Sequence, residues 1–390
     1  MRVMGLISGT SMDGIDIATA DFQLDGDRVE MSPLGSLAVP YHAELRAELE
    51  AALPPAGTTA ATICRLDNEV GRAFASAAES ALEQLGVGAE LVVSHGQTLY
   101  HWIDEGRARG TLQIGQPAWI AEATGLPVVA DLRAADVAAG GQGAPLAAIF
   151  DVLLLGGRNR ICAALNLGGI ANVTVVGPGL SPIAFDTGPG NTLIDAAVRH
   201  LTGGSFDRGG EIARQGTIHQ PLLDRLLSEP YYRALPPKTT GRELFHLAYL
   251  LAAVADAGPV PPEDLVATVT ALTARTVADA CRGLGVDEVI VSGGGAENSF
   301  LLELLSAELD DTTVHPIDDL GVPAAFKEAY FIALIGFLTM KGLPGNVAAA
   351  TGASRPAILG SVTPGPVVPM WPAPAKEIPQ ALRILDVASR

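Results

Sequence analysis

Hydroxyl and carboxyl side chains gather in one short stretch near the start of the chain. The apolar run Met4–Ile7 predicts a buried strand, and the alternating apolar residues of 15–20 predict a second one. Ser8-Gly9-Thr10-Ser11-Met12-Asp13-Gly14 lies between them, and its Asp-Gly pair favours a hairpin turn. Backbone N–H groups and hydroxyls in such a turn can bind phosphate oxygens, and Asp13 or Asp16 can hold the accompanying Mg²⁺. Two interpretations stay open, a phosphate-binding turn and an ordinary hairpin turn with polar side chains.

Asp186 is a second carboxylate that could do chemistry, because a glycine-containing segment follows it. It follows the apolar run Ile183–Phe185, which predicts a strand, and it precedes Thr187-Gly188-Pro189-Gly190. A carboxylate presented from a strand end into a glycine-lined cleft is well placed to act as a general base. The alternative is an Asx turn that caps the helix expected to begin near Asn191.

The elements expected around these two carboxylates follow one plan twice. In the first half, the hairpin is followed by a helix, a strand and a glycine-containing segment, at Asp67–Gly86, Glu90–Val93 and Ser94–Thr98. In the second half, a hairpin at Ile161–Leu165 and Ala171–Val176 is followed by the same series, at Glu263–Gly283, Glu288–Val291 and Gly293–Gly295. This order indicates an internal duplication of an α/β unit. Glycine turns at the strand ends of both units would face one cleft, where α/β sheets bind ligands.

The glycine-rich segment at 139–145 predicts the boundary between the two units. The first unit is expected to take residues 1–134, completed by part of the C-terminal segment, and the second to take 135–365. Residues 366–390 form a tail without an assigned place. Residues 23–66 are interpreted as an excursion with a helix near Ala43–Leu53, and short strands are expected at Gln113–Gly115 and Pro127–Ala130.

Composition excludes several classes of protein. The 390 residues carry a formal net charge of −18, so the surface repels nucleic acid and anionic membranes. The longest apolar runs are about half the length of a membrane span. Three cysteines without paired spacing argue against a disulfide framework or a structural zinc site and suit a reducing cytoplasm. Four lysines leave phosphate contacts to backbone N–H groups, arginine, hydroxyls and metal.

A series of short motifs resembles the 1,6-anhydro-N-acetylmuramic acid kinase family. The opening GLISGTSMDGID at 5–16 is similar to the signature of that family. Further matching motifs follow in order along nearly the whole chain: SHGQT at 94–98, QIGQP at 113–117, ADLR at 130–133, GGQGAPL at 140–146, NLGGIAN at 166–172, FDTGPGN at 185–191, PPKTTGRE at 236–243, SGGGAEN at 292–298, KEA at 327–329, NVAAATGASRP at 346–356 and LGSVTPG at 359–365. Many ordered motifs are far more specific than any single one.

The resemblance implies a fold and an activity. The fold is α/β, with duplicated ribonuclease H-like domains of the actin-like ATPase and sugar kinase superfamily, whose mixed sheets are flanked by helices around an interdomain cleft. The activity is the ATP- and Mg²⁺-dependent conversion of 1,6-anhydro-N-acetylmuramic acid, a cell-wall recycling product, to N-acetylmuramic acid 6-phosphate. Water opens the anhydro bridge while O6 takes the γ-phosphoryl group. The resemblance also suggests a homodimer.

The resemblance assigns residues to each part of this reaction. Asp186 becomes the base that activates water. The nucleotide is assigned to the first turn, the second turn and the last glycine loop, with Asp13 and Asp16 near the metal: Gly9, Thr10, Ser11, Met12, Asp13, Gly14, Ile15 and Asp16; Gly168, Gly169 and Asn172; Gly293, Gly294, Gly295 and Asn298. The sugar is assigned to His95, Gln97, Asp131, Arg133 and Arg242, with an arginine for its lactyl carboxylate. Structural roles remain the alternatives, such as a helix cap for Asn298 and a salt bridge for either arginine.

Two other functional classes remain to be distinguished. A phosphohydrolase of the same superfamily, such as an exopolyphosphatase, would need a strongly basic channel, which four lysines in an acidic chain do not favour. A slow ATP switch like actin or a heat-shock chaperone would need an added peptide-binding or polymerising segment, which the sequence does not indicate. Release of ADP that depends on the anhydro-sugar would separate the kinase from both.

Overall fold

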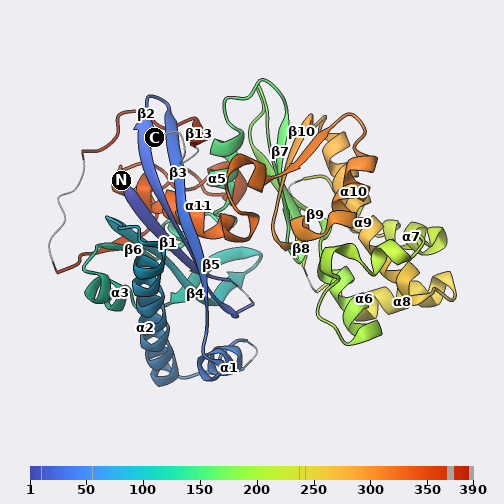
Figure 1. The fold of residues 1–390 in the computed structure, drawn as a ribbon, viewed down its shortest axis with the longest axis horizontal. Coiled ribbons are helices and arrows are strands. Elements are labelled where there is room, and N and C mark those ends of the chain that lie inside the picture. The colour runs from blue at the N-terminus through green and yellow to red at the C-terminus, as the bar shows by residue number, and fades with distance from the viewer. Residues whose placement is uncertain (10, 55, 237, 242, 367–372, 386–390) are drawn as a thin grey trace. The chain divides into compact units, whose positions relative to one another are not determined.

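The computed structural model describes residues 1–390 except 10, 55, 237, 242, 367–372 and 386–390 (Figure 1). The chain forms two compact units, Met1–Gly156 with Phe326–Arg390 and Gly157–Ala325. Each unit has its own mixed sheet, and helices flank both sheets. The expected α/β fold class is therefore confirmed. Each unit is described by itself below.

The sheet of the first unit has eight strands. Its order is β12-β6-β4-β1-β2-β3-β13, with β5 paired to β4. The strands span Arg2–Ser8 (β1), Gly14–Asp25 (β2), Arg28–Pro40 (β3), Leu91–Asp104 (β4), Arg107–Ile114 (β5), Val128–Ala130 (β6), Ser361–Thr363 (β12) and Ala381–Ile384 (β13). β2 is antiparallel to both of its neighbours, β1 and β3. β4 is parallel to β1, and β6 is parallel to β4.

Helices cover both faces of this sheet. They span Ala43–Ala51 (α1), Ala60–Leu85 (α2), Pro117–Thr124 (α3), Ala134–Ala138 (α4), Ala148–Leu155 (α5), Lys327–Met340 (α11) and Ala348–Thr351 (α12). Met4 and Leu6 of β1 belong to the core cluster that contains Phe74 of α2. Gly5 points to the other face, where a Cβ would come within 2.2 Å of the backbone oxygen of Ala329 in α11. The alternation of β1 thus places it between two helices, and the close approach of α11 requires glycine.

The sheet of the second unit repeats the central five strands of the first. Its order is β11-β10-β7-β8-β9, and the strands span Cys162–Leu167 (β7), Ile170–Val176 (β8), Ile183–Pro189 (β9), Glu288–Ser292 (β10) and Thr313–Pro316 (β11). β7, β8 and β9 are antiparallel neighbours, and β10 and β11 continue the sheet in parallel from β7. The order and directions equal those of β6-β4-β1-β2-β3, which is the ribonuclease H-like arrangement. The predicted duplication is confirmed.

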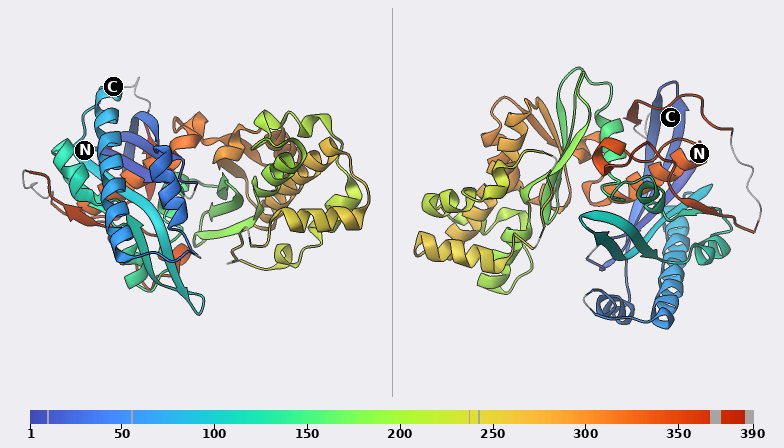
Figure 2. Two further views of the ribbon diagram at one scale, coloured as in Figure 1. Left: turned by 90° about the horizontal axis from the view of Figure 1, so that it is seen from below. Right: turned by 180° about the vertical axis from the view of Figure 1, so that it is seen from behind.

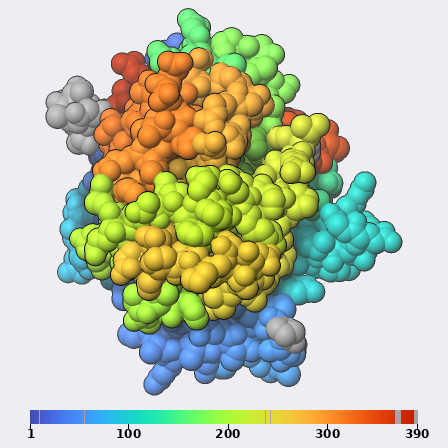
Figure 3. Space-filling view, turned by 90° about the vertical axis from the view of Figure 1, so that its right-hand side faces the viewer, coloured from blue at the N-terminus to red at the C-terminus, as the bar shows by residue number. Residues whose placement is uncertain are grey.

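The second unit places its helices in two layers. They span Thr192–Thr202 (α6), Gln220–Leu227 (α7), Leu247–Ala257 (α8), Pro262–Gly283 (α9) and Ser299–Glu308 (α10), with short 3₁₀ turns at Arg208–Gly210, Ala213–Gln215, Pro230–Arg233, Gly294–Glu297, Ile317–Leu320 and Ala324–Phe326. α9 and α10 pack on the apolar face of the sheet, α6 and α7 pack on α9, and α8 packs on α6 and α7 (Figure 2). Figure 3 looks onto these helices, coloured from yellow-green to orange.

Several predicted elements have different bounds in the structure. The expected excursion at 23–66 contains the end of β2 and all of β3, joined by a turn at Gly26 with φ of 58°. The strand predicted at Glu90–Val93 continues as β4 to Asp104, so the segment Ser94–Thr98 lies inside a strand and not in a loop after it. α2 begins seven residues before Asp67, because the Thr59 hydroxyl caps it by accepting from the Thr62 N–H.

The predicted unit boundaries also need correction. Residues 135–156 and 326–365 belong to the first unit and not to the second. Buried Asp136 accepts hydrogen bonds from Asn346 and Thr351 and so ties the glycine-rich segment to residues two hundred positions away. Lys327 of α11 forms a buried ion pair with Asp151 of α5. Part of the 366–390 tail also belongs to the first unit, because β13 pairs in parallel with β3.

Candidate active site

The turn between β1 and β2 is held from β4. The Ser8 hydroxyl donates to Gln97 Oε1 at 2.7 Å, and Gln97 Nε2 donates to the Gly9 carbonyl at 3.2 Å. Ser11 donates to Asp13 at 2.8 Å, and Met12 adopts a positive φ of 51°. Gln97 is fully buried and holds this turn through both ends of its side-chain amide, and its contact with the sugar stays a prediction. Thr10 of this turn lies outside the described residues.

Acidic side chains converge next to the same turn. Asp16 lies in β2 opposite Ile7, and burial, Asp13 and Glu328 raise its pKa to about 6. Burial also raises the pKa of Glu328, the second residue of α11. Asp13 and Glu328 thus disfavour the charge of Asp16, and a bound cation would offset this effect. Among the described residues no three His, Cys, Asp or Glu side chains form a ready ligand set for a metal ion.

The second hairpin turn, between β7 and β8, is fastened to the start of α6. The N–H groups of Gly190 and Thr192 donate to the Gly169 carbonyl, and that of Asn191 donates to the Gly168 carbonyl. Gly190 must be glycine, since a Cβ there would come within 2.3 Å of the Gly168 oxygen. The carbonyl groups of Gly168 and Gly169 therefore accept hydrogen bonds from the segment that leads into α6.

A row of polar residues crosses the sheet of the second unit beside this turn. Ser292 in β10 pairs with Asn166 in β7, Asn166 pairs with Asn172 in β8, and Asn172 pairs with Asp186 in β9. Directly opposed residues share one face of a sheet. Leu165 and its neighbours point to the other face, into the core under α9. The row therefore lies on the face away from α9, with Asp186 at its end and Asn172 beside it.

Asp186 sits in the middle of β9 and not at a strand end. Its Oδ2 accepts hydrogen bonds from the Thr239 hydroxyl at 2.7 Å and the Thr240 N–H at 2.9 Å. The Tyr231 hydroxyl donates to its carbonyl at 2.7 Å, and its own N–H donates to the Lys238 carbonyl. The described residues offer no hydrogen bond to Oδ1. The capping alternative is wrong, because the carboxylate binds the 238–240 segment and not the first turn of α6.

Sequence analysis included Thr239 and Thr240 in the PPKTTGRE motif but assigned them no role. It also missed Asn166 and Ser292, which follow from the register of β7, β8 and β10. The pairing of a strand with its neighbours is visible in a sequence only when the hairpins are aligned on one another. Such an alignment places Asp16 and Asn172 at the third position of β2 and β8.

In the first unit, His95 and Arg133 bind each other. The Arg133 guanidinium donates to the Gly143 carbonyl at 2.6 Å and lies 3.0 Å from His95 Nε2. Because a guanidinium can only donate, Nε2 accepts and the proton of the neutral ring is on Nδ1. Burial and the nearby Arg133 lower the pKa of His95 to about 3. Asp131, two residues before Arg133, has a left-handed φ of 56°. Arg242, the other predicted partner of a carboxylate, lies outside the described residues.

The third glycine segment follows β10. Gly293 has φ of 82°, and a Cβ there would come within 2.5 Å of Asn166 Oδ1. A Cβ on Gly295 would come within 2.6 Å of Leu167, whereas Gly294 borders open space. Asn298 caps α10 by accepting a hydrogen bond from the Leu301 N–H at 3.0 Å, so the helix-cap role given above as the alternative is present. Its contact with adenosine stays a prediction.

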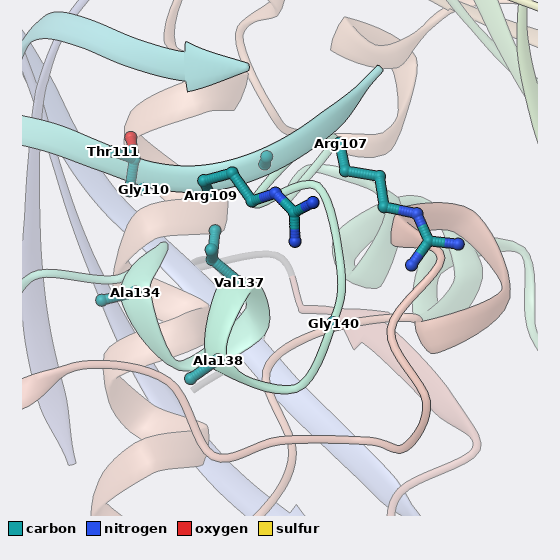
Figure 4. A pocket seen from close by; sticks show the side chains of 9 residues that line it. Arg107, Arg109, Gly110, Thr111, Ala134, Val137, Ala138 and Gly140 are labelled. Atoms are coloured by element: carbon teal, nitrogen blue, oxygen red, sulfur yellow. The ribbon is translucent and has the colours of Figure 1, made fainter. Parts of the chain in front are cut away.

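A surface pocket of about 460 Å³ lies between β5 and α4 in the first unit (Figure 4). Arg107 and Arg109 extend into it from β5, and Val137 and Ala138 of α4 form its other side. Arg109 Nε lies 3.5 Å from Asp104 Oδ2, and this ion pair partly neutralises the positive charge of Arg109. The lining includes none of the predicted site residues that the structure describes.

Comparisons with known proteins agree with the motifs. The model of the family described as anhydro-N-acetylmuramic acid kinase matches residues 1–365. A protein of that name from Streptomyces coelicolor is 55% identical over 388 residues, which cover 99% of each chain. The Gloeobacter violaceus protein of the same name is 43% identical over 93% of this chain and 98% of its own.

Solved structures show a weaker similarity. Component A of (R)-2-hydroxyglutaryl-CoA dehydratase from Acidaminococcus fermentans aligns with a TM-score of 0.42 and 13% identity, over 86% of this chain and 96% of its own. These values are too low to argue from. The family model and the sequence relatives span both units, with the Asp186 segment and both hairpin turns inside the match. The chain therefore belongs to the anhydro-N-acetylmuramic acid kinase family.

Proposed function

We propose that this protein is an ATP-dependent kinase that hydrolytically opens 1,6-anhydro-N-acetylmuramic acid and phosphorylates O6, giving N-acetylmuramic acid 6-phosphate and ADP in peptidoglycan recycling. Family membership supports the reaction class. The geometry of Asp186 carries the proposal. Thr239 and Thr240 engage one carboxylate oxygen and leave the other without a hydrogen bond from the described residues.

That geometry suits a general base. Hydrogen bonds from Thr239 and Thr240 to Oδ2 fix the orientation of the carboxylate, so Oδ1 is free to take a proton from water. The water oxygen then bonds to C1 of the sugar while the bond from C1 to O6 breaks. O6 bonds to the γ-phosphorus as the bond to the β-phosphate oxygen breaks, and ADP leaves. The proton ends on Asp186, which returns it to solvent with the product.

The two hairpin turns are the proposed phosphate contacts. Gly9, Ser11 and Asp13 in the first turn offer an N–H-rich loop with hydroxyl and carboxyl groups, and Gly168 and Gly169 in the second turn offer small residues beside Asn172. The Gly293–Gly295 segment is the proposed adenosine contact, with Gly294 facing open space. Asp13 and Asp16 would hold Mg²⁺, which would neutralise phosphate charge during transfer. Phosphoryl transfer asks mainly for positioning, and several modest contacts provide it.

We further propose a cytoplasmic homodimer. The three cysteines are free, which agrees with a reducing compartment. No helix among the described residues has the length and apolar character to cross a membrane. Tyr100, Trp102 and Ile103 in β4 are each about half exposed, which makes this strand a candidate contact with a second copy. Light scattering after size exclusion tests the dimer, and alanine at Trp102 tests the contact.

The experiment that tests the proposed function compares wild type with Asp186→Asn. Wild type should release ADP in proportion to added anhydro-sugar, and the asparagine variant should not, while both bind ATP equally. ATP hydrolysis at the same rate with and without sugar would instead indicate a phosphohydrolase or an ATP switch.

A further inference from the structure

A cavity of about 560 Å³ lies in the second unit, behind the strand that carries the proposed base. Phe185 and Thr187, the two neighbours of Asp186 in β9, line it together with the C-terminal end of α9. Asp186 itself belongs to the row on the face away from α9, so the cavity and that row lie on opposite sides of one strand. The proposed reaction makes no use of this cavity.

One piece of chain both lines the cavity and holds Asp186. We call it the Lys238 segment, and it comprises residues 231–236 and 238–240. The Lys238 carbonyl accepts from the Asp186 N–H at 3.1 Å, and the Tyr231 hydroxyl donates to the Asp186 carbonyl. Thr239 and Thr240 bind its carboxylate, as described above. A molecule that packs in the cavity therefore also contacts the support of the proposed base.

The charges that line the cavity favour an anion. They are Arg233, Lys238, Arg275 and Asp279. Arg275 is already paired, with Glu308 at 2.7 Å and with Asp279 at 3.8 Å. Among the described residues neither Arg233 nor Lys238 forms an ion pair, and burial lowers the pKa of Lys238. A bound carboxylate would pair with these two cations and offset the effect of burial on Lys238.

The rest of the lining is largely apolar. It includes Phe185, Leu227, Leu235, Pro236 and Leu284. Leu235 is 86% exposed, so a large apolar side chain at the rim has little cover from the described residues. The volume lies within the range of about 300–1,000 Å³ that is typical of small-molecule pockets. An inorganic anion would leave this apolar surface in contact with water, whereas an anion with an apolar body would cover it.

We infer that this cavity is an effector site for a small organic carboxylate with an apolar body, bound through Arg233 and Lys238. The occupant packs under the Lys238 segment and reduces its motion, because that segment has few covering side chains of its own. Resting on the proposed function of Asp186 as the base, a steadier segment keeps Thr239 and Thr240 on the carboxylate. The effector therefore raises kcat and leaves the Kd for ATP unchanged.

Binding is tested by calorimetry without ATP or sugar. The probe is 4-phenylbutyrate, which should bind wild type with a Kd of about 1 mM or tighter. Arg233→Ala should weaken binding by about tenfold, because the carboxylate loses a charged hydrogen bond. The matched control is Arg199→Ala, which removes an exposed arginine of α6 outside the cavity and should bind like wild type. Equal binding to wild type and Arg233→Ala, or no binding to wild type, overturns the inference.

Two further comparisons test the chemistry of the site. The amine 4-phenylbutylamine has the same apolar body and the opposite charge, and it should not bind; binding as tight as that of the acid would overturn the inference. Ala280→Phe fills the cavity from α9 and should abolish binding of the acid. Unchanged binding to that variant would place the probe elsewhere and overturn the inference too.

Hydrogen exchange tests the coupling to Asp186 without any need for kinase activity. The probe should slow exchange of the Asp186 N–H, which donates to the Lys238 carbonyl, in wild type but not in Arg233→Ala. Under saturating probe, kcat should rise in wild type only. Binding with unchanged exchange would overturn the effector role. A protein that binds the probe and slows exchange, yet phosphorylates no sugar, would instead refute the proposed function and leave the site in place.

Discussion

Replacing Asp16 by asparagine should stabilise the free protein at pH 8 while impairing its activity. The pKa of Asp16 is raised from its ordinary 3.8 to about 6 by burial, Asp13 and Glu328, so its ionised form is disfavoured in the folded state. At about 1.36 kcal/mol for each pH unit, this difference corresponds to at most about 3 kcal/mol. Partial solvent contact screens the charge, so we expect about 1–2 kcal/mol and a Tm rise of about 3–6 °C.

The pH dependence of this effect has a definite sign. Below pH 3.8 Asp16 is protonated in both the folded and the unfolded state, so its charge costs nothing there. Between pH 3.8 and about 6 the folded state binds more protons than the unfolded state, so wild type loses stability as the pH rises. The asparagine side chain of the variant does not titrate, and the advantage of the variant should therefore grow through this window and stay constant above it.

Urea unfolding with EDTA at pH 4, 6 and 8 measures the effect. The control is Asp27→Asn, whose side chain is 64% exposed in the β2–β3 turn and should leave stability unchanged. In steady-state assays, the Mg²⁺ concentration for half-maximal rate should rise by about tenfold in Asp16→Asn but not in the control. A variant that is less stable than wild type at pH 8 would refute the electrostatic argument.

Three further substitutions have defined outcomes. Asp186→Asn should lower kcat by about 100- to 10,000-fold without changing the ATP Kd, and a near-normal kcat would remove its role as base. Gly5→Ala should destabilise by about 1–3 kcal/mol, because its Cβ would meet the Ala329 oxygen; urea unfolding tests this, and wild-type stability would show that α11 can move away. Asp136→Ala should destabilise by about 3 kcal/mol, since Asn346, Thr351 and the Gly143 N–H all lose an acceptor. Unchanged protection of Gly143 from hydrogen exchange in that variant would count against the network.

Local signals explain why much of the fold could be predicted. The β1–β2 hairpin follows from an Asp-Gly turn between apolar runs, and Gly86 ends α2 in the left-handed conformation that glycine favours. The β2–β3 hairpin carries the same signal at Asp25-Gly26, yet the expected excursion at 23–66 leaves β3 out. The duplication was predictable because each half repeats its element order within a continuous stretch.

Long-range contacts explain what could not be predicted. The unit boundary depends on Asp136 meeting Asn346 and Thr351 and on Lys327 meeting Asp151. Local sequence periodicity carries no information about such pairs. The β4 extension is a local feature instead, because from Gln97 onward β4 forms a hairpin with β5, the next strand in the sequence.

The candidate site divides in the same way. Motifs made Asp16, Asp186 and both hairpin turns candidates, since carboxylates and glycine turns suit phosphate binding and the activation of water. The partners of each side chain come from tertiary structure. Gln97 supports the Gly9 turn, and Thr239 holds Asp186, neither of which spacing alone could assign.

Mass spectrometry of the reaction products tests the central claim most directly. The purified protein is incubated with ATP, Mg²⁺, 1,6-anhydro-N-acetylmuramic acid and water enriched in ¹⁸O. The account predicts N-acetylmuramic acid 6-phosphate with ¹⁸O at C1, one ADP for each sugar, and at least about 100-fold slower formation of this product by Asp186→Asn. Inorganic phosphate carrying ¹⁸O, with the anhydro-sugar unchanged, would contradict it.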